Sequence, residues 1–256
     1  MKSKLILPKG EVILPSNIRP IEASILDKRY KPLMREVDKL AQYFEKKGAK
    51  PSLSVIKYNP EEEVVQGSNT YSVVLVNMAL KGSNYRTATS QDLEYVIYAN
   101  DPKFNAFHLM NNYEDTGLAL RNSEGYNAYQ AQDLIKQLKE KLGSEFKLPY
   151  KIDLSNLELR VDRNSPSGLA FNVLDASKAF YSQILNGKTG TFDSNDPGLL
   201  KNGIPNELGP GNRTLYTSKE GLCGLCLDRG LDLDSVEDDL EDSGSDGRVG
   251  VVGEAD

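Results

Sequence analysis

The sequence has few of the residues on which most metal sites and many active sites depend. Its 256 residues include one histidine, two cysteines and no tryptophan. His108, Cys223 and Cys226 supply three zinc ligands at most, so even one zinc site would need a carboxylate as well. P-loop, Gly-x-Gly-x-x-Gly, His-Glu-x-x-His and Gly-x-Ser-x-Gly motifs are absent. We therefore expect no catalytic residue, no metal site and no cofactor, and a protein that is not an enzyme.

Long hydrophobic runs are missing too. The longest apolar run, Val73–Val76, is far shorter than the roughly 20 residues of a transmembrane helix. Only three apolar residues precede Pro8, which is too short for the core of a signal peptide. The net charge of −6 argues against nucleic-acid binding, which needs a basic face. We expect no membrane span and no nucleic-acid partner, and the sequence assigns neither a compartment nor an oligomeric state.

Helical and strand-like segments are mixed along the chain. Apolar spacing predicts helices over residues 21–48, 128–142 and 174–185, and Thr89–Asp92 has the composition of a helix cap. Val, Ile and Tyr favour strands over residues 52–58 and 70–80, with a hairpin connection between them, and over residues 152–161. Residues 101–126 are rich in loop formers, and residues 186–213 predict a long irregular segment. This mixture indicates an α+β protein.

The charge is concentrated at the C-terminal end. Residues 221–256 carry eleven acidic and two basic side chains, a net charge of −9, whereas the first 220 residues carry +3. An acidic disordered tail is one interpretation of this composition. Leucines at strand spacing argue against it, because a solvated tail does not need them. We therefore predict a buried framework made of Leu222, Leu225, Leu227, Leu231, Leu233 and Leu240.

Two motifs in this segment have chemical interpretations of their own. Cys223-Gly-Leu-Cys226 matches the redox pattern Cys-x-x-Cys, but that motif belongs at the start of a helix, and this segment is strand-like. Asp232 and Asp234 begin like an EF-hand loop, but Val236 stands where the third ligand belongs. Two independent small side chains and a solvated or ligand-facing acidic surface are the favoured interpretations. An irregular calcium site stays open.

Three segments carry a resemblance to a known family. They are Gly211-Asn-Arg-Thr-Leu-Tyr216, the segment from Gly221 to Ser235, and the segment from Leu240 to Val252, which closes on Gly247-Arg248-Val249. Together they resemble the C-terminus of the variable target proteins of diversity-generating retroelements, most closely the archaeal forms. In that family a reverse transcriptase copies a template with errors at adenines, and the copy replaces the 3′ end of the target gene.

The resemblance implies a C-type-lectin-like fold of the formylglycine-generating-enzyme type. It implies an N-terminal segment and helix over residues 1–50, packed on a domain of residues 51–256 with a variable region at about 221–250. The resemblance also adds Arg248 to the predicted framework of buried leucines. The ligand-binding residues it implies are Cys223, Cys226, Asp228, Gly230, Asp232, Asp234, Val236, Asp238, Asp242 and Asp246.

The composition of the segment agrees with adenine mutagenesis. Mutating both adenines of an AAY codon gives NNY codons, which cannot encode Lys, Gln, Glu, Met or Trp. Residues 221–253 contain no Lys, Gln, Met or Trp, and we predict that Glu237 and Glu241 are fixed positions. The implied partner is a variable ligand, a protein on another cell or a virus, and a cell or virion surface is compatible with that role. The alternatives are a calcium-dependent carbohydrate-binding lectin and a formylglycine-generating-enzyme-like oxidase, which would need a reactive thiol.

Overall fold

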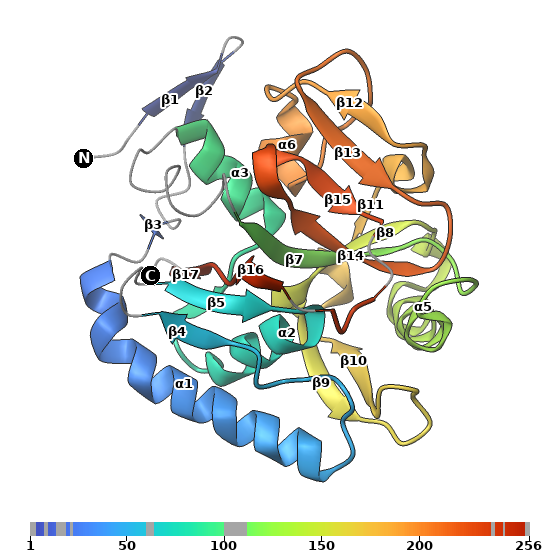
Figure 1. Ribbon diagram of the computed structural model, residues 1–256. Helices are drawn as coiled ribbons and strands as arrows, with labels where there is room; N and C mark the ends of the chain where they lie inside the picture. Colours follow the sequence, from blue (N-terminus) through green and yellow to red (C-terminus); the bar gives the residue numbers. More distant parts are fainter. Residues whose placement is uncertain are drawn as a thin grey trace.

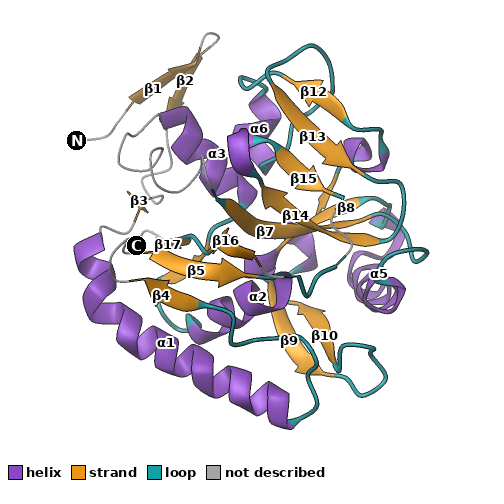
Figure 2. Cartoon of the chain, viewed as in Figure 1, coloured by secondary structure: helices purple, strands orange, loops and turns teal. Residues whose placement is uncertain are grey.

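The computed structural model describes residues 4–7, 10–13, 19–20, 23–59, 64–99, 112–236, 239–242 and 244–253. Figures 1 and 2 show helices and strands together, so the predicted α+β class is confirmed. The α-helices in these ranges are α1 (Ala23–Lys46), α2 (Thr70–Ala79), α3 (Ser90–Ala99), α5 (Ala128–Leu142) and α6 (Pro197–Asn202). The strands are β1 (Lys4–Leu7), β2 (Gly10–Ile13), β3 (Arg19–Pro20), β4 (Lys57–Asn59), β5 (Val64–Ser68), β6 (Tyr85–Thr87), β7 (Tyr113–Leu120), β8 (Tyr150–Asp153), β9 (Leu157–Val161), β10 (Leu169–Val173), β11 (Phe180–Tyr181), β12 (Gly190–Phe192), β13 (Arg213–Thr217), β14 (Leu222–Leu227), β15 (Leu233–Ser235), β16 (Gly244–Arg248) and β17 (Val251–Gly253). No helix in these ranges has the length and apolar character that a bilayer crossing requires.

The main sheet is mixed and centres on β7. Its strands follow the order β12-β13-β15-β14-β7-β16-β5-β4, and β8 and β11 branch from it. β14 pairs along one edge of β7, while the other edge is shared by β16 at Tyr113–Glu114 and by β8 at Gly117–Leu120. The sequence predicted a loop-rich segment here, which is wrong for residues 113–120. Two carboxylates and a glycine interrupt the apolar alternation that marks a strand.

Two hydrophobic clusters lie on opposite faces of this sheet. Leu118, Leu120 and Leu222 belong to one, which α1, α2 and α5 cover. Ala119, Leu225 and Leu227 belong to the other, together with buried residues of α3 and α6. Successive strand residues point to opposite faces, so β7 and β14 supply both clusters. The segment that the resemblance marks as variable is therefore built into the centre of the fold.

Three helix predictions are confirmed. α1 buries Val37, Ala41 and Phe44, and Figure 1 shows it along one side of the molecule, against α2 and β4. α5 spans the predicted residues 128–142 and buries one apolar stripe against the first cluster. α3 starts as its cap predicts, because Asp92 accepts hydrogen bonds from the amide and the hydroxyl of Thr89. The division at residue 50 stays a prediction.

The predicted strand over residues 70–80 is wrong, because α2 occupies it. Asn69 caps this helix and forms a reciprocal pair of hydrogen bonds with Ser72. Residues 70–76 are all buried, and a helix that is apolar on every side has no periodic signature to separate it from a buried strand. The predicted strand over residues 52–58 is also mostly wrong, because β4 begins only at Lys57 and runs to Asn59. β5 lies in the expected connection.

Later segments were predicted in part. The strand region 152–161 is two strands, β8 and β9, separated by a short turn of 3-10 helix. The predicted helix over residues 174–185 is wrong, because β11 lies there between two 3-10 turns. The irregular segment 186–213 contains β12 and α6. His108 lies outside the described residues.

Candidate binding surface

Strand pairing sorts the C-terminal residues into two rows on opposite faces of the sheet. Four adjacent strands, β13, β15, β14 and β7, pair residue against residue. The inner row, which faces the cluster shared with α3 and α6, is Leu215, Leu233, Leu227 and Glu114. The outer row is Tyr216, Asp234, Cys226 and Asp115. The alternation predicted for Leu227/Leu233 against Cys226/Asp234 therefore holds.

The predicted framework is buried, with one exception. Leu222, Leu225, Leu227, Leu233, Leu240 and Arg248 are buried. Leu231 is half-buried and packs against the cluster shared with α3 and α6. It lies in a short 3-10 turn, η6 (Arg229–Leu231), with a positive φ of 70°. The predicted strand spacing therefore fails at Leu231, which lies in a turn, and holds at Leu233, which lies in β15.

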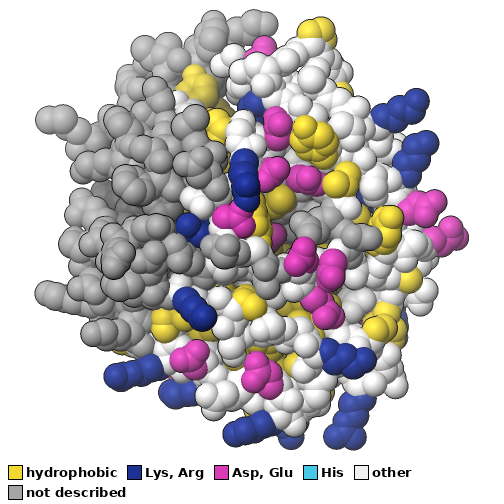
Figure 3. Space-filling view, viewed as in Figure 1, with side chains coloured by type: hydrophobic (Ala, Val, Ile, Leu, Met, Phe, Trp, Pro, Cys, Tyr) yellow, Lys and Arg dark blue, Asp and Glu magenta, His cyan; other side chains and the backbone are white. Residues whose placement is uncertain are grey.

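Most of the predicted ligand-binding residues reach the surface. Val236 is 40% exposed, and Gly230 and Asp242 are exposed as well. Asp228, Asp232, Asp234 and Asp246 are half-buried, and Asp246 forms an ion pair with Arg229. Figure 3 shows acidic side chains near the centre of this face and most Lys and Arg toward its margins. Asp238 and Glu237 lie outside the described residues.

The prediction that Cys223 and Cys226 face solvent is wrong. Both are buried, and no disulfide joins these two described residues. Cys223 pairs across from Ala119 on the inner face, where its sulfur lies 3.8 Å from the hydroxyl of Ser218. Cys226 points to the outer face, since residues three apart in a strand have opposite orientations. A small residue in a leucine-rich segment can fill a core as readily as a surface, so residue size did not reveal this burial.

Gly230 is poorly suited to extensive variation. Its φ of 81° lies in the left-handed region, and the space where a side chain would begin is open. Glycine, asparagine and aspartate tolerate this backbone, while β-branched residues are strained in it. The backbone conformation, and not the room for a side chain, therefore limits which residues can replace Gly230.

Side chains from outside the C-terminal region bind its main chain at many points. Hydrogen bonds join eight of them to main-chain amides or carbonyls of residues 221–250. We call them the anchor side chains: Asn69, Tyr113, Glu114, Thr116, Arg121, Asn122, Asn127 and Arg213. Because these contacts reach main-chain atoms, the bonded residue contributes no side-chain atom to them.

Arg213 is the anchor of the turn at residues 229–231. Its Nε donates to the carbonyl of Leu231 at 2.5 Å. Its two terminal nitrogens each donate to one carboxylate oxygen of Glu94 on α3, both at 2.7 Å. The guanidinium also lies over the ring of Phe192, 5.0 Å from its centroid. Burial raises the pKa of Glu94, and the hydrogen bonds from Arg213 oppose that rise.

Arg121 anchors β15 from the inner face. Its side chain is 1% exposed, and it donates to the carbonyl of Leu185, the hydroxyl of Thr217, and both the carbonyl and hydroxyl of Ser235. Burial lowers the pKa of this guanidinium from its usual value. One side chain thus joins β7, β13, β15 and the turn at Leu185.

Two adjacent carboxyl groups of β7 lie at the point where β16 joins the sheet. Glu114 accepts a hydrogen bond from the amide of Gly250 at 3.0 Å, and burial raises its pKa to about 7 while that bond and Arg248 oppose the rise. Asp115, on the outer face, accepts from the hydroxyl of Ser68 at 2.6 Å, and burial raises its pKa to about 6. Burial therefore holds the pKa values of both carboxyl groups above their usual range.

Four aspartates of the predicted binding surface have different surroundings: Asp228, Asp232, Asp234 and Asp242. Asp232 accepts a hydrogen bond from the amide of Thr214 on β13, at 2.6 Å. Burial raises the pKa of Asp234, and the negative charge of Asp228 adds to that rise. Asp232 thus has a structural contact with a neighbouring strand.

We expect Asp232→Ala to lower the free energy of unfolding by about 1 kcal/mol, because it removes the acceptor of the Thr214 amide. Asp228→Ala, in the same loop, should change it by less than about 0.5 kcal/mol. Urea unfolding at neutral pH measures both values. Equal effects of the two changes would show that the bond to Thr214 contributes no net stability.

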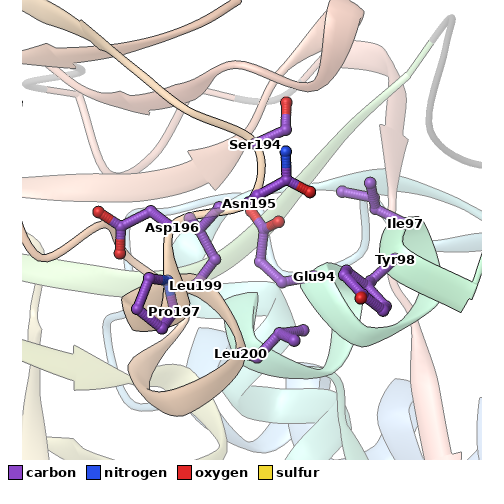
Figure 4. Close-up of a pocket in the computed structure, with 9 residues that line it drawn as sticks. All are labelled: Glu94, Ile97, Tyr98, Ser194, Asn195, Asp196, Pro197, Leu199 and Leu200. Carbon is purple, nitrogen blue, oxygen red and sulfur yellow. The ribbon is translucent and has the colours of Figure 1, made fainter. Parts of the chain in front are cut away.

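A small pocket lies beside the Arg213 anchor (Figure 4). It is lined by α3 and by the segment that enters α6, including Glu94, Tyr98, Asn195 and Leu200. Its volume of about 20 Å³ suits one water molecule rather than an organic ligand. The described residues contain no group of three or more His, Cys, Asp or Glu side chains placed to hold a metal ion.

No protein-family model, no curated protein and no solved structure matches this chain. Sequence reasoning did not identify Glu94, Arg121 or Asn127 as parts of the site. The signal available for Arg121 was a basic residue placed directly after the apolar run Leu118-Ala119-Leu120. Arg213 and Tyr216 lie within a segment that the resemblance had marked.

Proposed function

We propose that this chain is a ligand-binding protein of C-type-lectin-like type, whose C-terminal surface is diversified by adenine-directed mutagenic retrohoming. It acts by recognition rather than by catalysis, and its partner is a variable ligand, a protein on another cell or a virus. The constant part of the protein supplies the fold, and the side chains exposed in residues 221–250 supply specificity.

The observation that carries this proposal is the set of anchor side chains. A diversified surface needs a backbone whose position does not depend on the side chains that change. Eight side chains outside residues 221–250 bind main-chain atoms within it, so exchange of an exposed side chain removes none of those bonds. The leucines of the region meanwhile fill the core, where volume changes cost several kcal/mol, on the order of 2–5 for Leu→Ala.

The genomic test of this proposal is direct. The DNA near the gene should contain a near-copy of the codons for residues 221–252, with differences confined to adenines in that copy, beside a reverse-transcriptase gene. The differing codons should include those for Asp228, Asp234 and Val236, and should spare those for the buried leucines. An intact locus without such a copy would remove diversification from the proposal.

We expect the exposed positions to tolerate simultaneous change. The triple variant Asp228→Ser, Asp234→Tyr, Val236→Asn should lose no more than about 1.5 kcal/mol of unfolding free energy, since single surface changes cost under about 0.5. Urea unfolding measures this loss. The control is Leu225→Ala, which opens a cavity beneath the same surface and should lower the free energy of unfolding by more. A triple variant less stable than that control would refute a variable role for these positions.

A further inference from the structure

An exposed tyrosine lies beside the acidic segment but outside residues 221–250. Tyr216 on β13 is paired with Asp234 on β15, so both side chains project from the outer face of the sheet. Tyr216 is 38% exposed, although its neighbour Leu215 is completely buried. α3 and α6 cover the inner face of these strands, opposite to Tyr216. The surface offered to a partner therefore extends beyond the predicted variable region onto β13.

The backbone that carries Tyr216 and Asp234 is held firmly. The hydroxyl of Ser235 donates to the carbonyl of Tyr216 at 3.0 Å, and Arg121 binds Ser235 from the inner face. A tyrosine on such a backbone loses little conformational freedom when it binds a partner, which is a property of strong contact residues.

The surroundings of Tyr216 combine apolar area with negative charge. Val236, 40% exposed, lies two residues after Asp234 in the chain, and its amide donates to the Asp234 carboxylate at 2.8 Å. Asp228 is close enough for its charge to raise the pKa of Asp234. A cation placed here would relieve the repulsion between Asp228 and Asp234.

We propose that Tyr216 is a constant contact residue of the binding surface and that, with Asp234, it binds an arginine side chain presented by a protein partner. A guanidinium is planar, stacks on a tyrosine ring and forms paired hydrogen bonds with a carboxylate. An ammonium group offers neither the plane nor the paired donors, so arginine fits this pair of residues better than lysine does. This inference rests on the proposed function, because it names the partner chemistry of the same surface.

The test is a selection of peptides from a random library displayed on phage, panned on the full chain at low ionic strength. Selected peptides should be enriched in arginine, and their binding should weaken as salt is added. Replacing the key arginine of a synthetic peptide by citrulline, which keeps the shape but removes the charge, should weaken binding about tenfold or more.

Protein variants assign this contact to its residues. Tyr216→Ala and Asp234→Asn should each weaken peptide binding about tenfold, Tyr216→Phe should retain most of it, and Tyr43→Ala, at a tyrosine 52% exposed on α1, should leave it unchanged. Selected peptides without an arginine excess, equal binding to Tyr216→Ala, or binding that a chelator abolishes would each overturn the inference. A missing genomic template would instead remove diversification and leave these results unaffected.

Discussion

Replacing Arg213 by methionine should lower the free energy of unfolding by about 3–5 kcal/mol, because it leaves Glu94 buried without its partner. The variant also loses the bond to the carbonyl of Leu231, so amide exchange at residues 228–232 should quicken. Urea unfolding and hydrogen-exchange mass spectrometry measure these two effects.

The matched control is Arg160→Met. Arg160 is also ion-paired, in its case with two carboxylates, Asp133 and Asp162, at 2.7 and 2.8 Å, but its side chain is 40% exposed. Arg160→Met should lower the free energy of unfolding by less than about 1 kcal/mol. The double variant Arg213→Met, Glu94→Leu should recover much of the stability lost in the single one, since no unpaired charge stays buried. Equal losses at Arg213 and Arg160 would mean that burial of the Glu94 pair has no special effect.

Wild-type stability should decline as the pH rises from about 4.5 to about 7, and Glu114→Gln should remove most of that decline. The pKa of Glu114 is 4.5 in its ordinary state and about 7 in the fold, so the folded protein favours the protonated form. The stabilisation is complete below the lower value and is lost as the pH passes the upper one. The difference corresponds to about 3 kcal/mol.

The variant is expected to match wild type near pH 4 and to exceed it near pH 8, because the glutamine carbonyl still accepts the Gly250 amide. Urea unfolding across this pH range gives both profiles. Asp115→Asn should remove a separate component between the ordinary pKa of 3.8 and about 6. Asp242→Asn, which removes an exposed carboxylate, is the matched control. A Glu114→Gln profile as steep as that of wild type would refute the role of Glu114.

The local spacing of apolar residues predicted those elements that bury one face and expose the other to solvent. α1, α3 and α5 were predicted from apolar spacing and a cap, and the alternation of Leu225 and Leu227 was predicted from strand period. The same reasoning failed for α2, which is buried on all sides. It also failed for Cys223, since an inward-facing cysteine and an outward-facing one look alike in a sequence.

The sequence by itself determined the α+β class, the long helices and the leucine framework, because each of these depends on neighbours a few residues apart. Tertiary structure alone decided that β7 is the central strand, that Glu94 forms a buried ion pair with Arg213, and that Arg121 binds the backbone of β15. Those contacts join residues about a hundred positions apart, such as Arg213 with Glu94 and Arg121 with Ser235. A charged residue is compatible with both a surface and a buried ion pair, and only the packing of distant strands selects between them.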